Sequence, residues 1–309
     1  MVAAVVVLYN PEIRLLDRLL RSVIGQVERI FVIDNTSDST VDFGSFFHQY
    51  TERISYLALG ENKGVATAQN IGIRESIKAG CSHVLFLDQD SSLPPDMVKQ
   101  LLDAEVELVN AGKRIAAVGP LFVDEKTGRS SRATRHDSVL IHRILLDRNS
   151  RVPVETDYLI ASGSLIRCEV LADIGMMRDE LFIDWVDVEW GLRAKRHGYR
   201  CYVVPTATMT HSIGDKIGTL WGFKIRLHSD VRHYYMVRNA AYLIRSKTMG
   251  WQRRIITACK LPINICLFSW FSVQKIKSFK LLLRALLDGM GSRTGQLAPN
   301  LQTNADQRR

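Results

Sequence analysis

The strongest constraint on how this chain can fold is the segment V-L-F-L-D-Q-D at residues 84–90, where a short apolar run ends at two aspartates. The apolar run is too short for a helix and is typical of a buried strand in a parallel sheet. Because side chains alternate along a strand, we expect Asp88 and Asp90 to face the same way as the chain leaves the sheet. Ligands of open α/β sheets bind at the carboxyl ends of the strands, so the segment predicts a functional site at this edge.

Two neighbouring carboxylates are a donor set suited to a hard cation. We expect Asp88 and Asp90 to bind Mg²⁺ or Mn²⁺, with phosphate oxygens of a ligand completing the coordination shell. A D-x-D segment alone is also compatible with a solvated turn after a strand. Other segments of the chain are needed to distinguish a metal site from such a turn.

Apolar runs and helical patterns alternate through the first part of the chain, which predicts an α/β fold with a mostly parallel sheet. Strand-like runs occupy residues 3–8, 29–34, 54–59, 84–88, 115–123 and 200–204, and helices are expected after Pro11, over 66–79, after Pro94 and from Trp185.

The chain of 309 residues is 46% hydrophobic and 24% charged, as expected for a globular protein. Its five cysteines are scattered without a C-x-x-C pair, which favours a reducing compartment and disfavours a structural zinc site. We expect no signal peptide, since the apolar first residues lack a basic leader.

The segment E-N-K-G-V-A-T-A-Q-N-I-G-I at residues 61–73 predicts a turn at Asn62 and Gly64 followed by a helix that opens with small residues. Backbone amides at such a helix start attract a diphosphate, and small side chains allow a close approach. The segment is not G-x-G-x-x-G, and the chain contains no G-x-x-x-x-G-K-[ST]. A dinucleotide-dependent dehydrogenase and a phosphate-loop ATPase are therefore unsupported.

Two further segments are candidates for ligand binding. Asp34 follows the second strand, where an acidic side chain often binds a ribose or base; it could equally cap the following turn. Residues 124–157 are polar, basic and irregular, so we expect either a flap over the site or a disordered excursion. Residues 158–167 are strand-like, with Ser162-Gly163-Ser164 as a point of close approach.

A second acidic cluster occurs in L-F-I-D-W-V-D-V-E-W-G-L-R-A-K-R-H-G-Y at residues 181–199. Asp184, Asp187 and Glu189 crowd the start of the helix predicted there. Because a helix N-terminus tolerates acids, a charged cap is the alternative to a catalytic role.

The C-terminal part is basic. Residues 224–288 contain 13 Lys or Arg and 2 Asp or Glu, a local charge of +11. Because the whole chain has a net charge of +9, the remaining residues sum to about −2. These cations alternate with large apolar residues, which favours an anionic membrane surface over nucleic acid. Residues 251–287 predict two amphipathic helices lying in the membrane plane, with a helical cap packed on the domain as the alternative; Lys260 and Pro262 interrupt the first apolar run, which is too short to span a bilayer. We expect residues 291–309 to be disordered.

The ordered set of motifs resembles the family 2 glycosyltransferases with a GT-A fold, a Rossmann-like, mixed, mostly parallel sheet flanked by helices. The resemblance covers residues 2 to about 240 and depends on V-V-L-Y-N, V-I-D-N, N-K-G-V-A-T-A-Q-N-I-G, L-D-Q-D, A-S-G-S, F-I-D-W-V-D-V-E-W-G-L-R-A and H-Y-Y-M-V-R-N. The form F-I-D-x-V-D-x-E-W is most similar to bacterial rhamnosyltransferases, which use dTDP-L-rhamnose to build surface polysaccharides. We therefore expect a catalytic domain over residues 1–240, a basic amphipathic helical region over 241–290 and a disordered tail over 291–309.

This resemblance implies an inverting, metal-dependent sugar transfer. The family's acidic pair corresponds to Val186-Asp187, so the resemblance assigns the base to Asp187; the first acid of the pair is replaced by Val186, and Asp184 or Glu189 could act instead. It also implies that His211 is a third metal or diphosphate ligand, although a lone histidine is often only a structural hydrogen-bonding group. The residues expected around the donor nucleotide are Tyr9, Asn10, Asp34, Asn62, Gly64, Asn70, Asp88 and Arg238. For Arg238, an ion pair within the fold is the alternative to a bidentate contact with the diphosphate.

The resemblance implies a nucleotide-sugar donor, dTDP-L-rhamnose, and a saccharide acceptor of O-antigen or capsule assembly. A link from this acceptor to polyprenyl diphosphate is compatible with the resemblance. No nucleic-acid partner is expected, and the enzyme is expected to be cytoplasmic and peripheral on the inner face of the plasma membrane. The alternatives are a UDP- or GDP-hexose donor, a sugar-nucleotide nucleotidyltransferase, or a non-catalytic basic membrane-binding module. A nucleotidyltransferase would need a Gly-rich basic loop after the first strand, where the chain has Tyr9-Asn10-Pro11-Glu12.

Overall fold

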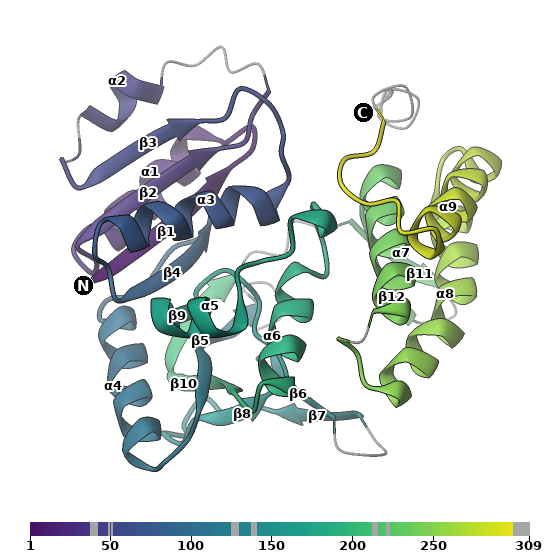
Figure 1. Ribbon diagram of the computed structural model, residues 1–309. Helices are drawn as coiled ribbons and strands as arrows, with labels where there is room; N and C mark the ends of the chain where they lie inside the picture. The colour runs from purple at the N-terminus through teal and green to yellow at the C-terminus, as the bar shows by residue number, and fades with distance from the viewer. Residues whose placement is uncertain are drawn as a thin grey trace.

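The computed structural model describes residues 1–37, 43–48, 50, 52–124, 130–136, 141–211, 216–220, 223–246 and 248–298. Its centre is an eight-stranded sheet with the strand order β3-β2-β1-β4-β9-β5-β10-β8. Figure 1 shows this sheet with its helices on one side of the molecule and the helices α7, α8 and α9 on the other.

The first half of the chain alternates strand and helix, as the sequence predicts. β1 (Val2–Leu8) lies between β2 (Arg29–Asp34) and β4 (His83–Asp88) and is parallel to both. The carboxyl ends of these three strands therefore meet at one edge of the sheet. The other elements of this half are α1 (Ile13–Val23), α2 (Phe43–His48), β3 (Ile54–Ala58), α3 (Val65–Lys78), α4 (Met97–Asn110) and β5 (Ile115–Asp124).

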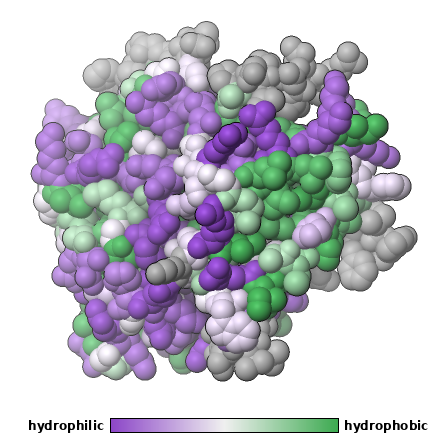
Figure 2. Space-filling view, turned by 45° about the vertical axis from the view of Figure 1, so that its right-hand side comes forward, coloured by the Kyte–Doolittle hydropathy of each residue, from purple (hydrophilic) through white to green (hydrophobic). Residues whose placement is uncertain are grey.

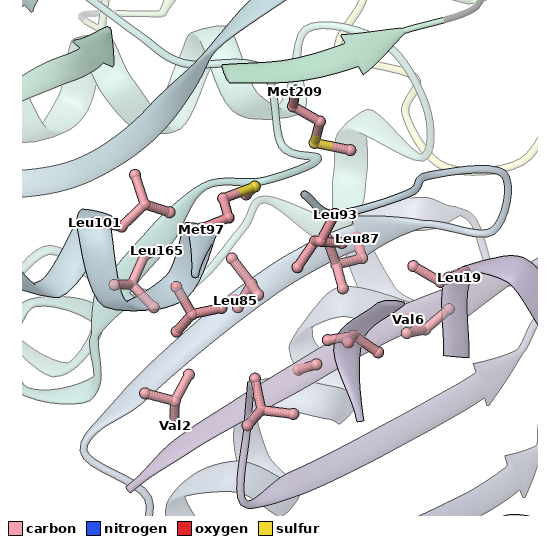
Figure 3. Close-up of a cluster of buried hydrophobic side chains, with 14 of the residues drawn as sticks. Val2, Val6, Leu19, Leu85, Leu87, Leu93, Met97, Leu101, Leu165 and Met209 are labelled. Atoms are coloured by element: carbon pink, nitrogen blue, oxygen red, sulfur yellow. The ribbon is translucent and has the colours of Figure 1, made fainter. Parts of the chain in front are cut away.

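Alternate residues of β1 enter two different cores, because successive side chains point to opposite faces of a sheet. Val6 and its alternate neighbours pack with α1 and α4, whereas Ala3 and Val5 pack with residues of α3. Figure 3 shows the first core, in which Leu19 of α1 and Met97 and Leu101 of α4 gather with the β1 and β4 side chains. Burial on both faces explains why these strands are continuous apolar runs.

The second half mixes parallel and antiparallel pairing. β5 and β10 (Arg200–His211) are parallel, whereas β9 (Leu165–Arg167) is antiparallel to β4 and β5, and β8 (Val154–Thr156) is antiparallel to β10. The expectation of a mixed, mostly parallel sheet is confirmed. The remaining elements here are β6 (Arg132–His136), β7 (Ile141–Leu145), α5 (Cys168–Ile174), a short 3-10 turn (Asp179–Leu181), α6 (Val186–Arg196), β11 (Lys216–Leu220) and β12 (Phe223–Leu227).

The segment 124–157 differs from its prediction as an irregular stretch. β6 and β7 form an antiparallel hairpin, and Ala133 of β6 packs in a small core with Leu121, Leu146 and Val203. Because the hairpin buries few side chains, most of its exposed positions are polar or basic, and the segment lacks the apolar run that predicts a buried strand. Residues 125–129 and 137–140 lie outside the described residues.

Two further strand boundaries differ from prediction. Residues 158–164 form a loop, and only the last part of the predicted strand, β9, pairs, because Gly163 has φ 75° and turns the chain away from the ladder. β10 continues past Pro205 instead of ending there, with a shift of register between Val204 and Thr208. Proline is tolerated at such an irregularity because no ladder hydrogen bond is needed from its nitrogen.

The C-terminal helices are α7 (Asp230–Arg245), α8 (Trp251–Phe271) and α9 (Lys275–Met290), and they share one apolar core. The predicted boundary after residue 240 falls inside α7. Pro262 lies within α8 without ending it. By length and composition alone α8 could cross a membrane, although Leu261, Ile265 and Phe268 bury one of its faces against the other helices.

The described part of the predicted tail makes specific contacts. Leu297 is buried, and its backbone N–H donates to the hydroxyl of Tyr235 at 2.8 Å. The backbone N–H of Gly295 donates to the carbonyl of Glu180. Residues 299–309 lie outside the described residues.

Candidate functional site

The two aspartates of L-D-Q-D lie at a turn rather than along a strand. β4 ends at Asp88, and the backbone N–H of Ser91 donates to the Asp88 carbonyl at 3.0 Å, closing a turn around Gln89 and Asp90. The Gln89 side chain is paired with the end of β1, accepting from Tyr9 N–H at 2.8 Å and donating to Tyr9 O at 3.1 Å. The turn, and not the alternation of a strand, therefore places the two exposed aspartates.

Asp34 anchors the ends of β2 and β3. It is almost completely buried; one carboxylate oxygen accepts from Thr36 N–H at 3.0 Å, and the other accepts from the Tyr56 hydroxyl at 2.8 Å. The threonine hydroxyl in turn accepts from Asn10 N–H at 2.9 Å. Asp34 thus caps the following turn, and a contact with the donor base stays a prediction.

The turn at residues 62–64 is fixed by side-chain amides. Asn62 Oδ1 accepts from Asn35 Nδ2 at 2.8 Å and from Gly64 N–H at 3.0 Å. Gly64 has φ 85°, and a Cβ there would lie 2.6–2.8 Å from atoms of Phe182. A diphosphate was predicted to approach closely at this helix start. In this structure, Phe182 of the same chain makes the close approach to Gly64.

The A-S-G-S loop at residues 161–164 ties the two acidic segments together. Gly163 N–H donates to the Phe86 carbonyl at 2.7 Å, and Asp88 N–H donates to Ser162 Oγ at 3.3 Å. Ser162 Oγ also lies 2.7 Å from Ser91 Oγ in the turn. A Cβ at Gly163 would lie 2.7 Å from the Pro120 side chain, so the backbone needs glycine there.

Asp187 lies in the first turn of α6, beside this loop. Its carboxylate accepts from the backbone N–H groups of Val188, at 2.8 Å, and Ala161. Burial, aided by the negative charges of Asp184 and Asp88 and opposed by the two backbone donors, raises the pKa of Asp187 to about 6. A carboxyl group with this pKa can accept a proton near neutral pH, as a general base must.

The carboxylate of Asp187 borders a small cavity of about 20 Å³, whose lining includes Phe86, Ala161 and Trp190. This volume suffices for one water molecule. Asp88, 99 positions earlier in the chain, lies near enough for its charge to raise the pKa of Asp187.

The other two acids of the cluster are paired. Glu189 is fully buried and bonds Arg178 at 2.9 Å, Arg193 at 3.1 Å and the Thr248 hydroxyl at 3.2 Å. Asp184 forms an ion pair with Arg232 at 3.3 Å. Within the part of the chain that the structure describes, Asp187 alone of the three acids has no cationic partner. This favours Asp187 as the base.

Comparison with known proteins agrees with this arrangement. The family model described as glycosyl transferase family 2 matches residues 3–175, more than half of the chain. A curated relative, the dTDP-rhamnosyl transferase RfbF of Shigella flexneri, is 33% identical over 292 residues, which cover 94% of this chain and 96% of the relative. The chain belongs to glycosyl transferase family 2.

Solved structures share the fold of this family 2 glycosyltransferase at low sequence identity. S. aureus TarS 1-349 in complex with UDP-GlcNAc has a TM-score of 0.59 at 15% identity, covering 93% of this chain and 81% of that chain. GalNAc-T7 with UDP, GalNAc and Mn²⁺ has a TM-score of 0.57 at 15% identity, covering 85% and 55%. These likenesses and the mixed sheet confirm the predicted GT-A fold.

Two residues predicted to bind the donor of this glycosyltransferase instead form hydrogen bonds within the chain. The buried Asn70 amide bonds the backbone of Met177 in both directions and donates to Asp179 at 2.8 Å. Arg238 is 1% exposed, and its guanidinium donates to Asn239 and to the carbonyls of Glu180, Leu181 and Gly295. This placement argues against a diphosphate contact by either residue, and for Arg238 the partners are carbonyls and not an acid.

The proposed metal ligands are only partly described. His211 is the last residue of β10 and pairs with Asp124 in the ladder, but its side chain lies outside what the structure describes. Among the described residues, no group of three or more His, Cys, Asp or Glu gathers as a metal site. Asp88 and Asp90 nevertheless fit a magnesium-type cation, which takes one or two protein carboxylates and completes its shell with substrate phosphates and water.

Asn239 supports the loop before Asp187, a function that the sequence did not predict. Phe182, Asp184 and Trp185 all have φ between 61° and 66°, an uncommon conformation for residues other than glycine. Asn239 is fully buried, and its Nδ2 donates to the carbonyls of Leu181, Ile183 and Asp184 at 2.8–3.0 Å.

Aromatic contacts with α7 add to this support. The Phe182 ring stacks on Tyr235 at 4.9 Å, and Trp185 Nε1 donates to the Met236 carbonyl at 3.1 Å. In the sequence, the Arg238-Asn239 pair was noted as part of a motif, but the neighbouring residues do not indicate which distant carbonyls Asn239 bonds.

We predict that Asn239→Ala lowers the free energy of unfolding by about 1–3 kcal/mol, because it leaves buried carbonyls without a donor. Amide hydrogen exchange should accelerate over residues 182–188 more than in the central sheet. Urea unfolding and exchange measured by mass spectrometry test this, with Asn110→Ala at the exposed end of α4 as the control. Equal stability of the two variants would contradict the supporting role of Asn239.

Proposed function

We propose that this protein is an inverting rhamnosyltransferase that moves L-rhamnose from dTDP-L-rhamnose to a hydroxyl of a saccharide acceptor in surface-polysaccharide assembly. The observation that carries the chemistry is the proximity of Asp187, whose pKa is about 6 and which has no cationic partner among the described residues, to the Asp88 turn. The donor assignment is supported by the 33% identity to RfbF over nearly the whole of both chains.

The transfer is a single displacement. The acceptor oxygen forms a bond to C1 of the sugar while Asp187 takes the hydroxyl proton. The bond between C1 and the diphosphate oxygen breaks, and dTDP leaves with its electron pair. Because the base and the leaving group lie on opposite sides of the sugar, the configuration at C1 inverts.

We further propose that Mg²⁺ or Mn²⁺ binds at Asp88 and Asp90 together with the donor diphosphate. A cation there would neutralise the charge that develops on the leaving group. The exposure of both aspartates and the fixed turn between them support this assignment. His211 stays a candidate third ligand, and Tyr9, Asn10, Asn62 and Gly64 stay candidates for the walls of the donor site.

Thermal unfolding with nucleotides tests the donor and metal together. We expect dTDP and dTDP-L-rhamnose with Mg²⁺ or Mn²⁺ to stabilise the protein by about 2.7 kcal/mol at 100 times Kd, and EDTA to remove most of this gain. Asp90→Asn should lose the metal-dependent part, whereas the exposed Asp103→Asn on α4 should keep it. Stabilisation by UDP- or GDP-sugars alone would retain the glycosyltransferase and reject rhamnose.

We predict that Asp187→Asn lowers kcat by a factor of roughly 10² to 10⁴ while donor binding persists. For the wild type, kcat/KM should fall below about pH 6, because the base is then protonated. The folded pKa lies above the ordinary value, so ionisation of Asp187 destabilises the fold above about pH 6, and this cost vanishes towards pH 4. Asp187→Asn should therefore be at least as stable as the wild type at pH 8. A pH profile unchanged by the substitution would assign the base elsewhere.

We also propose that the enzyme is cytoplasmic and binds the inner face of the plasma membrane through α8 and α9. All five cysteines are free, as expected in a reducing compartment. Large apolar side chains are exposed on these helices, and Figure 2 shows a broad hydrophobic surface on the side that carries them. These residues are Trp251, Ile255, Ile263, Trp270, Val273, Ile276 and Leu287, with Lys275, Lys277 and Lys280 exposed among them.

Vesicle sedimentation tests this surface. We expect binding to vesicles containing phosphatidylglycerol, weaker binding to pure phosphatidylcholine, and a decrease with salt, because anionic lipids attract the lysines. Trp270→Glu should reduce binding severalfold, whereas Val106→Glu on the exposed face of α4 should not. Equal binding by the two variants would favour the alternative, a helical cap that only packs on the domain.

A further inference from the structure

A buried pair of serine hydroxyls joins two segments of the proposed site. Ser162 and Ser91 are almost completely buried, and their Oγ atoms lie 2.7 Å apart. Ser162 belongs to the A-S-G-S loop, and the backbone N–H of Ser91 closes the turn that follows β4. Because a buried hydroxyl is costly to leave without a partner, this pair holds together two segments that lie 71 positions apart in the chain.

The Ser162 side chain also contacts the backbone of the aspartate turn. Its Oγ accepts from the N–H of Asp88 at 3.3 Å, so Ser162 is bonded to both ends of the turn, at Asp88 and at Ser91. From the side of β1, Gln89 holds the same turn through its two hydrogen bonds with Tyr9. The turn is therefore attached to the strands on both sides of β4.

The residue next to Ser162 contacts the proposed base. The backbone N–H of Ala161 donates to the carboxylate of Asp187. The loop between them is a closed turn, since the N–H and the hydroxyl of Ser164 both donate to the Ala161 carbonyl, at 3.0 and 2.7 Å. A shift of this loop relative to the aspartate turn would therefore change the distance from the turn to Asp187.

The two serines of the loop differ in what their hydroxyls bond. The Ser164 hydroxyl bonds the Ala161 carbonyl, within the loop itself. The Ser162 hydroxyl is bonded outside the loop, to Asp88 and Ser91. Ser164 thus stabilises a local turn, whereas Ser162 connects one segment of the site to another.

An inverting transfer depends on such a connection. The cation proposed at Asp88 and Asp90 acts on the leaving diphosphate, and Asp187 acts on the acceptor hydroxyl from the opposite side of the sugar. The reacting atoms have to be aligned at about 3–3.5 Å, and a displacement of about 1 Å can cost a factor of about 10² in rate. Because the two groups lie 99 positions apart in the chain, their separation is set by contacts between segments.

We propose that Ser162 is a positioning residue, whose hydroxyl, paired with that of Ser91, fixes the aspartate turn at the distance from Asp187 that sugar transfer requires. The inference rests on the proposed function and assigns a role to two residues that take no part in binding or proton transfer. Removing either hydroxyl should let the turn and the base move independently, while the proposed metal ligands and the base are retained.

Amide hydrogen exchange of the ligand-free protein tests the connection without reference to sugar transfer. We expect Ser162→Ala to accelerate exchange severalfold over residues 86–92 and also over residues 186–190. The second segment should respond because the Val188 N–H bonds the carboxylate of Asp187, whose contact with the loop is loosened.

Ser76→Ala is the matched control for this experiment. The Ser76 hydroxyl is equally buried, but it donates to the Gly72 carbonyl within α3. This variant should leave exchange over both segments unchanged. Acceleration by Ser162→Ala over residues 86–92 alone, or over neither segment, would overturn the connection.

Kinetics test the consequence for catalysis. We expect Ser162→Ala and Ser91→Ala each to lower kcat by about tenfold or more, with the donor KM within about twofold of the wild type, because the aspartates remain in place. The double variant should lose no more than either single variant, because both changes break the same hydroxyl pair. Losses that multiply in the double variant, or a kcat equal to that of Ser76→Ala, would overturn the proposal.

Urea unfolding separates positioning from a purely structural role. A lower free energy of unfolding for Ser162→Ala with an unchanged kcat would make the hydroxyl pair structural only and overturn the proposal. If the wild type transfers no sugar, the proposed function fails, and the exchange experiment still decides whether Ser162 connects the turn to Asp187.

Discussion

The hydrogen bonds that Arg238 and Asn239 donate to backbone carbonyls are the interaction on which the site depends. They converge on residues 180–184, where the chain leaves the sheet domain and turns into α6. Left-handed conformations at residues other than glycine cost on the order of 1–3 kcal/mol each and persist only where surrounding structure fixes them. Here α7 supplies that structure, so the C-terminal helical region supports the loop that carries Asp187, the proposed base.

Three acids that are close in sequence have different partners in the structure. Glu189 is buried among arginines and links the segment after α5, α6 and the segment after α7. Asp184 is held by Arg232 of α7. Among the described residues, Asp187 accepts from backbone N–H groups without a cationic partner, and burial beside two other carboxylates raises its pKa to about 6. Carboxylates close in sequence thus differ in their partners: Glu189 and Asp184 are paired with arginines, whereas Asp187, the proposed base, accepts from backbone N–H groups.

Much of the fold follows from local sequence signals, and much of the site does not. The apolar runs of β1, β2 and β4 identify buried parallel strands, and the acidic turn after β4 follows from its position at a strand end. The β6–β7 hairpin was missed because it buries little, and the length of β10 was missed because a register shift accommodates Pro205. Asn70 and Arg238 were predicted to contact the donor, whereas in the fold Asn70 bonds Met177, 107 positions away, and Arg238 bonds Glu180, 58 positions away. No local pattern could identify partners at such separations.

By itself, the sequence determined the alternation of buried strands and helices and the positions of the acidic segments, because hydrophobic periodicity and turn residues act over a few neighbouring positions. Only the tertiary structure decided which acid has no cationic partner among the described residues, and which polar side chains form hydrogen bonds that hold the backbone in place. Those outcomes depend on contacts between segments far apart in the chain, whose partners are chosen by packing and by the need to satisfy every buried polar group.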